Sequence, residues 1–217
     1  MKIKYLFFVF IAFLLTSCSC SRENMSFKFG DFGPKVTESR SLRGFEGIEV
    51  YGSPTVYYQQ ADSFSVKVKG PKDIVDNIIT EVSDGKLTIR NRGKIGMFNI
   101  NFGGDYTLAV YVTSPDLVSV SLAGSGDFIS ERTVDTDNIT INLKGSGDIQ
   151  FSSLLCDRCN LEVVGSGDAS IRNLDTRETD VTLIGSGDID LRGTVQSMNK
   201  HKSGSGDIDT DNLKVGR

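Results

Sequence analysis

The tetrapeptide Gly-Ser-Gly-Asp occurs five times in this 217-residue chain, at residues 124–127, 145–148, 165–168, 185–188 and 204–207. Successive copies are 21, 20, 20 and 19 residues apart. A period this regular is typical of repeat proteins, in which each unit buries its apolar face by stacking on its neighbours. The motif therefore predicts a stack of short, equivalent units.

The residues before each motif alternate between apolar and polar side chains. The positions nine, seven and five before the motif Asp are mostly apolar, and those between them are mostly polar. A period of two indicates a β-strand with one buried face and one solvated face. The apolar set is Val118, Val120, Leu122, Ile139, Ile141, Leu143, Cys159, Leu161, Val163, Thr179, Val181, Leu183 and Met198. In the last unit Lys200 and Lys202 replace the aliphatic residues, which predicts either a poorly ordered final coil or a polar cap.

Strands that recur every 20 residues leave no room for a crossover helix, so they are expected to stack in parallel. Each coil then rises about 4.8 Å. With the right-handed crossover rule, the predicted fold is an all-β, right-handed, single-stranded parallel β-helix with Gly-Ser-Gly-Asp at its corner. The glycines permit positive φ and close approach of adjacent coils. The Ser and Asp side chains are expected to accept hydrogen bonds from backbone N–H groups at the bend.

The chain begins like an exported lipoprotein. Lys2 and Lys4 precede an apolar run from Tyr5 to Leu15, and Leu-Thr-Ser-Cys ends at Cys18. This pattern predicts a signal peptide over residues 1–17, too short to span a membrane as a helix. The ending resembles a bacterial lipobox, which implies cleavage before Cys18 and attachment of lipid to its thiol. Residues 18–41 are polar and irregular and are interpreted as the lipid anchor and a tether.

Residues 42–217 are predicted to form one domain, less regular over 42–112 and regular over 113–217. In the first part, Gly52-Ser53-Pro54 stands where a degenerate corner would. Residues 71–80 suggest a short amphipathic helix. Asp84-Gly85 predicts a two-residue hairpin. The net charge is −4, and it becomes −6 once Lys2 and Lys4 are removed, so no nucleic-acid partner is expected.

Phe45-Glu-Gly-Ile48, the Asp84-Gly-Lys-Leu-Thr-Ile89 hairpin and the repeated Gly-Ser-Gly-Asp-Ile resemble a known family. It is the auto-transporter adhesin head GIN domain, a domain of unknown function common in Bacteroidetes lipoproteins. The resemblance covers residues 42–215 and implies a pectin-lyase-like β-helix without established chemistry, for which cell adhesion has been proposed.

Few residues suggest chemistry. The chain lacks the nucleophile-elbow, dinucleotide-binding and phosphate-loop motifs, and its single histidine, His201, reads as a surface residue. Cys156 and Cys159 form one Cys-x-x-Cys, which offers too few ligands for zinc. Two alternatives remain for this pair: a local disulfide or a buried free thiol at Cys159. No cofactor or metal is predicted.

The column of motif aspartates is the one constellation of charged groups. Asp127, Asp148, Asp168, Asp188 and Asp207 are expected to lie one coil apart, where neighbouring carboxylates repel by roughly 1 kcal/mol in water. We interpret the column as structural, each carboxylate accepting N–H bonds from its own corner. The alternative is weak cation binding, because calcium prefers such oxygens.

The function expected from these observations is that of a non-enzymatic envelope lipoprotein, an adhesion or ligand-binding module on the outer membrane. Its expected partners are the membrane, through lipid on Cys18, and a glycan or another envelope protein. The alternative is a polysaccharide lyase or hydrolase, which needs an acid and a base gathered on one face. Tyr57, Tyr58 and Tyr111 are candidate sugar-stacking residues. An apolar cluster of Met97, Phe98, Ile100 and Phe102 either covers the end of the core or forms an interface for weak self-association.

Overall fold

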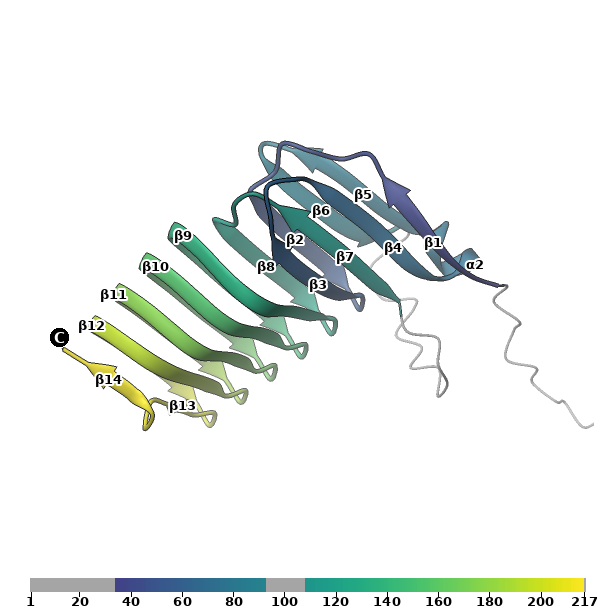
Figure 1. The fold of residues 1–217 in the computed structure, drawn as a ribbon. Coiled ribbons are helices and arrows are strands. Elements are labelled where there is room, and N and C mark those ends of the chain that lie inside the picture. Colours follow the sequence, from purple (N-terminus) through teal and green to yellow (C-terminus); the bar gives the residue numbers. More distant parts are fainter. Residues whose placement is uncertain (1–33, 93–107, 217) are drawn as a thin grey trace, which may run out of the picture. The chain divides into compact units, whose positions relative to one another are not determined.

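The computed structural model describes residues 34–92 and 108–216. Its described residues form a 14-stranded sheet system with one short helix (Figure 1). The first elements are β1 (Lys35–Arg40), β2 (Gly47–Gly52), β3 (Thr55–Gln60), β4 (Ser65–Pro71), α2 (Lys72–Val75), β5 (Ile78–Ser83), β6 (Lys86–Asn91) and β7 (Ala109–Ser114). They are followed by β8 (Ser119–Gly124), β9 (Asp127–Gly145), β10 (Ile149–Gly165), β11 (Ala169–Gly185), β12 (Ile189–Gly204), β13 (Ile208–Asp209) and β14 (Leu213–Val215).

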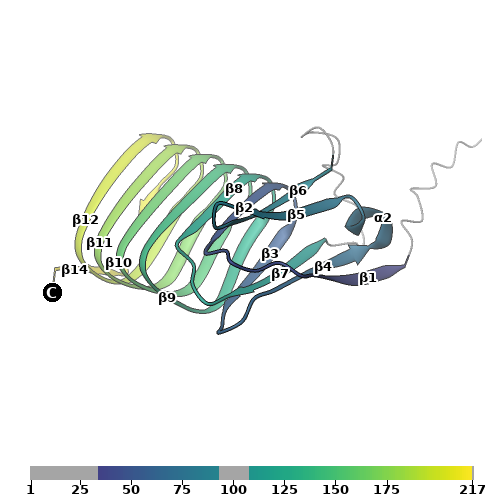
Figure 2. The ribbon, with the colours of Figure 1, turned by 90° about the horizontal axis from the view of Figure 1, so that it is seen from above.

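The long strands β9, β10, β11 and β12 pair in parallel, each with the equivalent residues of the next coil. Ile149 of β10, for example, lies between Phe128 and Ala169. Figure 2 shows these curved strands side by side, with β8 continuing the stack toward β2. The predicted fold class is therefore confirmed: the chain forms stacked parallel coils of a β-solenoid. In the part of the chain that the structure describes, no helix is long and apolar enough to cross a membrane.

The core runs inside the coils and is built from the predicted apolar columns. Ile141, Leu161 and Val181 are at most 2% exposed, and Phe128 and Phe151 pack with ring centroids 5.5 Å apart. Val118 departs from its column and is 38% exposed. It precedes β8 and donates its N–H to the Glu46 carbonyl at 2.7 Å, while its neighbour Leu117 fills the core instead.

The corners confirm the prediction made for the motif glycines. The first glycine of each motif has a φ between +126° and +147°. A Cβ on Gly165 would lie 2.2 Å from the Gly145 carbonyl oxygen, and one on Gly167 would lie 2.0 Å from that of Gly147. Gly52 has a φ of +107° and pairs with Gly124, so Gly52-Ser53-Pro54 is the expected degenerate corner.

The N-terminal part mixes parallel and antiparallel pairs. Strand β4 lies between β1 and β7 and is antiparallel to both. The predicted hairpin is confirmed, because β5 and β6 are antiparallel and joined by Asp84 and Gly85, both at positive φ.

Two sequence interpretations of this region need correction. Residues 71–80 were expected to form a helix, but only Lys72–Val75 is helical and β5 begins at Ile78. The β-branched Ile78 and Ile79 pair with β6 instead. The last part of the predicted tether is also not irregular, because Lys35–Arg40 forms β1, which pairs with β4. The pairing is made by backbone groups, because β1 itself has only one aliphatic residue, Val36.

The C-terminal end is closed by a polar cap, one of the two predicted alternatives. Strands β13 and β14 cover only Ile189–Asp190 and Gly193–Val195 of β12. Above the buried Val181 and Leu183 lie the paired Lys200 and Lys202. The Lys200 ammonium donates to Thr210 Oγ1 at 3.0 Å, and that of Lys202 lies 3.3 Å from Asp207 Oδ1.

Candidate functional site

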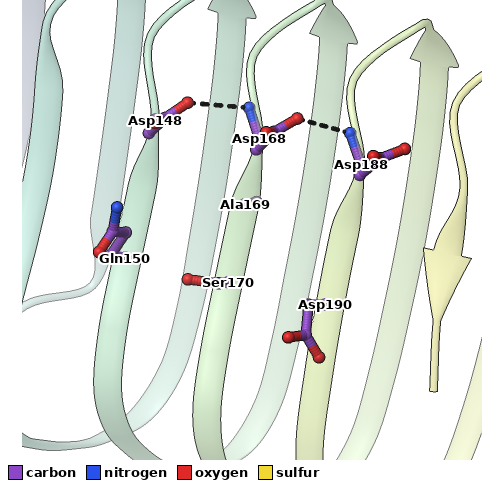
Figure 3. A pocket seen from close by; sticks show the side chains of 7 residues that line it. All are labelled: Asp148, Gln150, Asp168, Ala169, Ser170, Asp188 and Asp190. Atoms are coloured by element: carbon purple, nitrogen blue, oxygen red, sulfur yellow. Dashed lines mark hydrogen bonds between the residues drawn. The ribbon is translucent and has the colours of Figure 1, made fainter. Parts of the chain in front are cut away.

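The motif aspartates form a ladder that runs from coil to coil. The backbone N–H of Asp148 donates to Asp127 Oδ1 at 3.4 Å, and that of Asp168 donates to Asp148 Oδ1 at 3.2 Å. The Asp188 N–H repeats the contact on Asp168 at 2.8 Å (Figure 3). The Asp207 N–H repeats it on Asp188, also at 2.8 Å. The carboxylates therefore accept N–H bonds as expected, but from the next coil rather than from their own corner.

The motif serines do not share this role. In the described coils their hydroxyls accept no backbone N–H bond, and Ser186 and Ser205 bond each other at 3.1 Å. Most corner amides instead donate to the backbone of the preceding coil: the Ser166 N–H, for example, donates to the Gly145 carbonyl at 2.9 Å.

The ladder ends at Asp207, whose carboxylate has no following coil. The bond from Lys202 is the main cause that lowers the pKa of Asp207, and a backbone bond from Ile208 adds to it. Asp207 thus has a cation where the other carboxylates receive the N–H of the next motif Asp.

A shallow pocket of about 270 Å³ borders the ladder. Asp148, Asp168 and Asp188 form one side, and Gln150, Ser170 and Asp190 the other, with Ala169 between them (Figure 3). Asp190 is held by Arg192 at 2.7 Å. Among the described residues, no group of three or more His, Cys, Asp or Glu is arranged to hold a metal ion.

The same face continues toward the N-terminus with different chemistry. We call it the outer face: the outward side of the strand order β1-β4-β7-β3-β9-β10-β11-β12-β13. Cross-strand register places one row of side chains along it. The row reads Lys67, Tyr111, Tyr57, Ile129, Gln150, Ser170, Asp190 and Asp209. Its N-terminal half is aromatic and basic, and its C-terminal half is acidic.

Tyr57 and Tyr111 stack at the centre of the N-terminal half. Their ring centroids are 5.3 Å apart with an interplanar angle of 16°, and Tyr111 is 41% exposed. Lys67 lies opposite Tyr111, and Lys69 is the next residue of β4 on the same side. The tyrosines could be named from the sequence, but the lysines could not, because only the pairing of β4 with β7 brings them beside Tyr111.

Tyr58, the third candidate tyrosine, points the other way. It is 3% exposed, and its hydroxyl lies 3.1 Å from Ser114 Oγ. Burial, the main cause, raises the pKa of Tyr58 to about 12. Tyr58 is therefore a core residue that cannot contact a ligand on the outer face.

The two cysteines lie inside β10 as free thiols. Cys159 is fully buried between Ile139 and Thr179, and Cys156 is half-buried between Thr136 and Thr176. A hydrogen bond between the two side chains lowers the pKa of Cys156 and, together with burial, raises that of Cys159. The structure thus has the buried free thiol, one of the two predicted alternatives.

The remaining candidates fall into two groups. His201 is exposed on β12, as expected. The predicted lipidation site, Cys18, lies outside the described residues, and so does the apolar cluster of Met97, Phe98, Ile100 and Phe102.

Comparison with protein families gives a match over most of the chain. Residues 44–172 and 152–217 match the family described as "Putative auto-transporter adhesin, head GIN domain". The two matched stretches include the N-terminal strands and all five Gly-Ser-Gly-Asp corners.

Several crystal structures share the fold. A "putative lipid binding protein" from Parabacteroides distasonis has a TM-score of 0.75 at 22% identity, over 84% of this chain and 76% of its own. A "putative adhesin" from Bacteroides fragilis has a TM-score of 0.56 at 21% identity, over 81% and 96%. Another from Parabacteroides merdae has a TM-score of 0.57 at 16% identity, over 82% and 97%. At these identities the likeness establishes the fold alone.

Proposed function

This chain belongs to the family described as "Putative auto-transporter adhesin, head GIN domain", and we propose that it is a non-enzymatic adhesion module of the cell envelope that binds glycans through its outer face. The observation that carries the proposal is the stacked pair of Tyr57 and Tyr111. Tyrosine offers a ligand a large apolar ring and a hydroxyl, and loses little side-chain entropy on binding. Here the pair stands on β3 and β7, which are held by parallel backbone pairing.

The envelope location follows from the family and from the start of the chain. The adhesin family to which the chain belongs supports a location in the envelope or at the cell surface. The lipobox at Cys18 supports the finer proposal of an outer-membrane lipoprotein held by lipid on that thiol. A Cys18→Ala protein should not incorporate radiolabelled palmitate and should leave the membrane fraction, whereas Cys20→Ala should behave like the wild type. Labelled Cys18→Ala protein would contradict the assignment.

The competing function is a polysaccharide-acting enzyme on the same scaffold. Such an enzyme would need an acid and a base of separated pKa near one substrate position. On the outer face the ladder carboxylates accept backbone N–H groups, Asp190 is paired with Arg192, and Asp209 accepts from the Asp211 N–H. We therefore favour binding without turnover. New reducing ends released from polygalacturonate by the purified protein would reverse this choice.

A glycan array probed with the full-length protein in detergent tests the proposal. Bound glycans are expected, and Tyr111→Ala should reduce their signal at least tenfold. Tyr51→Ala is the matched control, because Tyr51 lies on β2, outside the outer face, and bonds Glu49. No glycan binding, or equal loss with both variants, would rule out glycan adhesion through this face.

A further inference from the structure

We infer that the glycan is anionic and that it binds at the Tyr–Lys patch, defined as Tyr57, Tyr111, Lys67 and Lys69. This inference rests on the proposed function and adds the ligand's class and its position. The ligand class is a polysaccharide that carries carboxylate or sulfate groups.

The patch is a compact group on three adjacent strands. Tyr57, Tyr111 and Lys67 lie side by side across β3, β7 and β4. Adjacent strands are about 4.8 Å apart, so the three side chains span roughly 10 Å. Lys69 lies beyond Lys67 on the same side of β4. The patch thus extends in two directions and can contact more than one sugar of a chain.

Its polar groups are unpaired donors. Among the described residues, neither tyrosine hydroxyl has a hydrogen-bond partner, and neither ammonium has an ion pair or a hydrogen bond. Lys67 and Lys69 are both exposed. Two positive charges and two free hydroxyls suit negatively charged oxygens, because charge-assisted hydrogen bonds are stronger than neutral ones.

The strands around the patch present no carboxylate on the outer face. The outward positions of β1, β4, β7 and β3 hold no carboxylate. They are occupied by Lys35, Thr37, Ser39, Ser65, Lys67, Lys69, Ala109, Tyr111, Thr113, Thr55, Tyr57 and Gln59. The first acid on this face is Asp127 of β9, opposite Thr55. On a protein of net charge −4, this is a local basic surface.

The acidic half of the outer face limits where such a ligand lies. Asp148, Asp168, Asp188 and Asp190 would repel an anionic chain that extended along β10, β11 and β12. An anionic polysaccharide is therefore expected to occupy the β1–β4–β7–β3 half only. A single small anion can meet only part of this patch, whereas a polymer gains from several charged groups at once.

Binding of full-length protein in detergent to three immobilised polysaccharides tests the inference. Heparin supplies sulfates, polygalacturonate supplies carboxylates, and dextran is neutral. We expect binding to at least one acidic polymer, weakening with added salt, and none to dextran. Lys67→Gln/Lys69→Gln should lower the affinity at least tenfold, and Tyr111→Phe should lower it less. Lys200→Gln/Lys202→Gln makes the same change of charge at the far end and should leave binding unchanged.

The possible failures separate the two proposals. Binding of dextran that depends on Tyr111 but not on the lysines would overturn the anionic ligand and leave glycan adhesion standing. No binding to any glycan would overturn both. If the two double-lysine variants weakened binding equally, the loss would come from the change in net charge. The Tyr–Lys patch would then not be the binding site. Lysine-dependent binding to phosphatidylglycerol vesicles, without binding to the acidic polymers, would assign the patch to a lipid surface instead.

Discussion

At the scale of single residues, glycine meets two separate restrictions at each corner. Gly165 has a φ of +133°, which disfavours any side chain, and its Cβ would also lie 2.2 Å from a carbonyl oxygen of the preceding coil. Gly167 is not among the glycines with a positive φ, yet its Cβ would lie 2.0 Å from the Gly147 carbonyl oxygen. Backbone conformation and coil spacing therefore each require glycine on their own.

Three alanine substitutions separate these causes. Gly85→Ala changes a residue with a φ of +74° and open space around it, so we expect a loss of about 1 kcal/mol. Gly165→Ala and Gly167→Ala force the coils apart, and each should cost at least 3 kcal/mol or prevent folding. Urea unfolding measures all three. A Gly167→Ala protein as stable as Gly85→Ala would show that the coils can separate at little cost.

Tyr58 gives a pH dependence with a definite sign. Its pKa is raised from 10.0 to about 12, chiefly because burial disfavours the phenolate. The folded state therefore holds this proton more tightly than the unfolded state, and the stabilisation is complete below pH 10. It should be lost between pH 10 and about 12, by on the order of 2 kcal/mol. In urea unfolding, the free energy of unfolding of Tyr58→Phe should not show this part of the decline with pH. That of Tyr57→Phe should still show it. A pH-independent difference between wild type and Tyr58→Phe would contradict the assignment.

At the scale of elements, the aspartate ladder joins strands that already share backbone bonds. Asp168 accepts from the Asp188 N–H, so Asp168→Ala leaves that amide without its partner. We expect a loss of 1–2 kcal/mol. Asp168→Asn keeps a carbonyl oxygen and removes a repelling charge, and should lie within about 0.5 kcal/mol of wild type. Asp137→Ala, at an exposed position of β9, is the control. A melting temperature that rises strongly with calcium, and no longer rises in Asp168→Ala, would instead support a cation site.

The elements also show what sequence can predict here. The corners and the inward columns were predictable, because every coil repeats the same contacts and the sequence therefore repeats the same residues. Strand β1 could not be predicted, because its pairing with β4 needs only backbone groups. The prediction of a helix over residues 71–80 was wrong beyond Val75, because Ile78 and Ile79 pair with β6 in a hairpin. The Tyr–Lys patch could not be foreseen, because residues 57, 67 and 111 meet only through the strand order β4-β7-β3.

At the scale of the whole solenoid, β12 is the last long strand of the stack among the described residues. Residues Ser197–Gly204 of β12 have no further strand beside them among the described residues. Such an edge can pair with another chain unless charge or shape prevents it. Lys200 and Lys202, placed over the aliphatic columns, provide that charge.

Replacing these lysines should make the end adhesive to other copies of the protein. In Lys200→Val/Lys202→Val the aliphatic columns continue to an uncharged edge, so we expect self-association that increases with concentration. Light scattering measures the mass. Arg132→Val/Lys144→Val, two exposed cations of β9, is the matched control. Equal masses for the two variants would mean that the lysines do not protect this edge.

The aspartate ladder also has a direction, with a consequence for how the molecule assembles. Every carboxylate from Asp127 to Asp188 receives an amide from the coil that follows it in the chain. A completed coil therefore presents a ready acceptor before its successor exists, and the successor adds by donating one amide to it. Coils that form in chain order can each complete one such bond as they add. Among the described residues the last acceptor is Asp207, whose carboxylate accepts from the Lys202 ammonium at 3.3 Å instead.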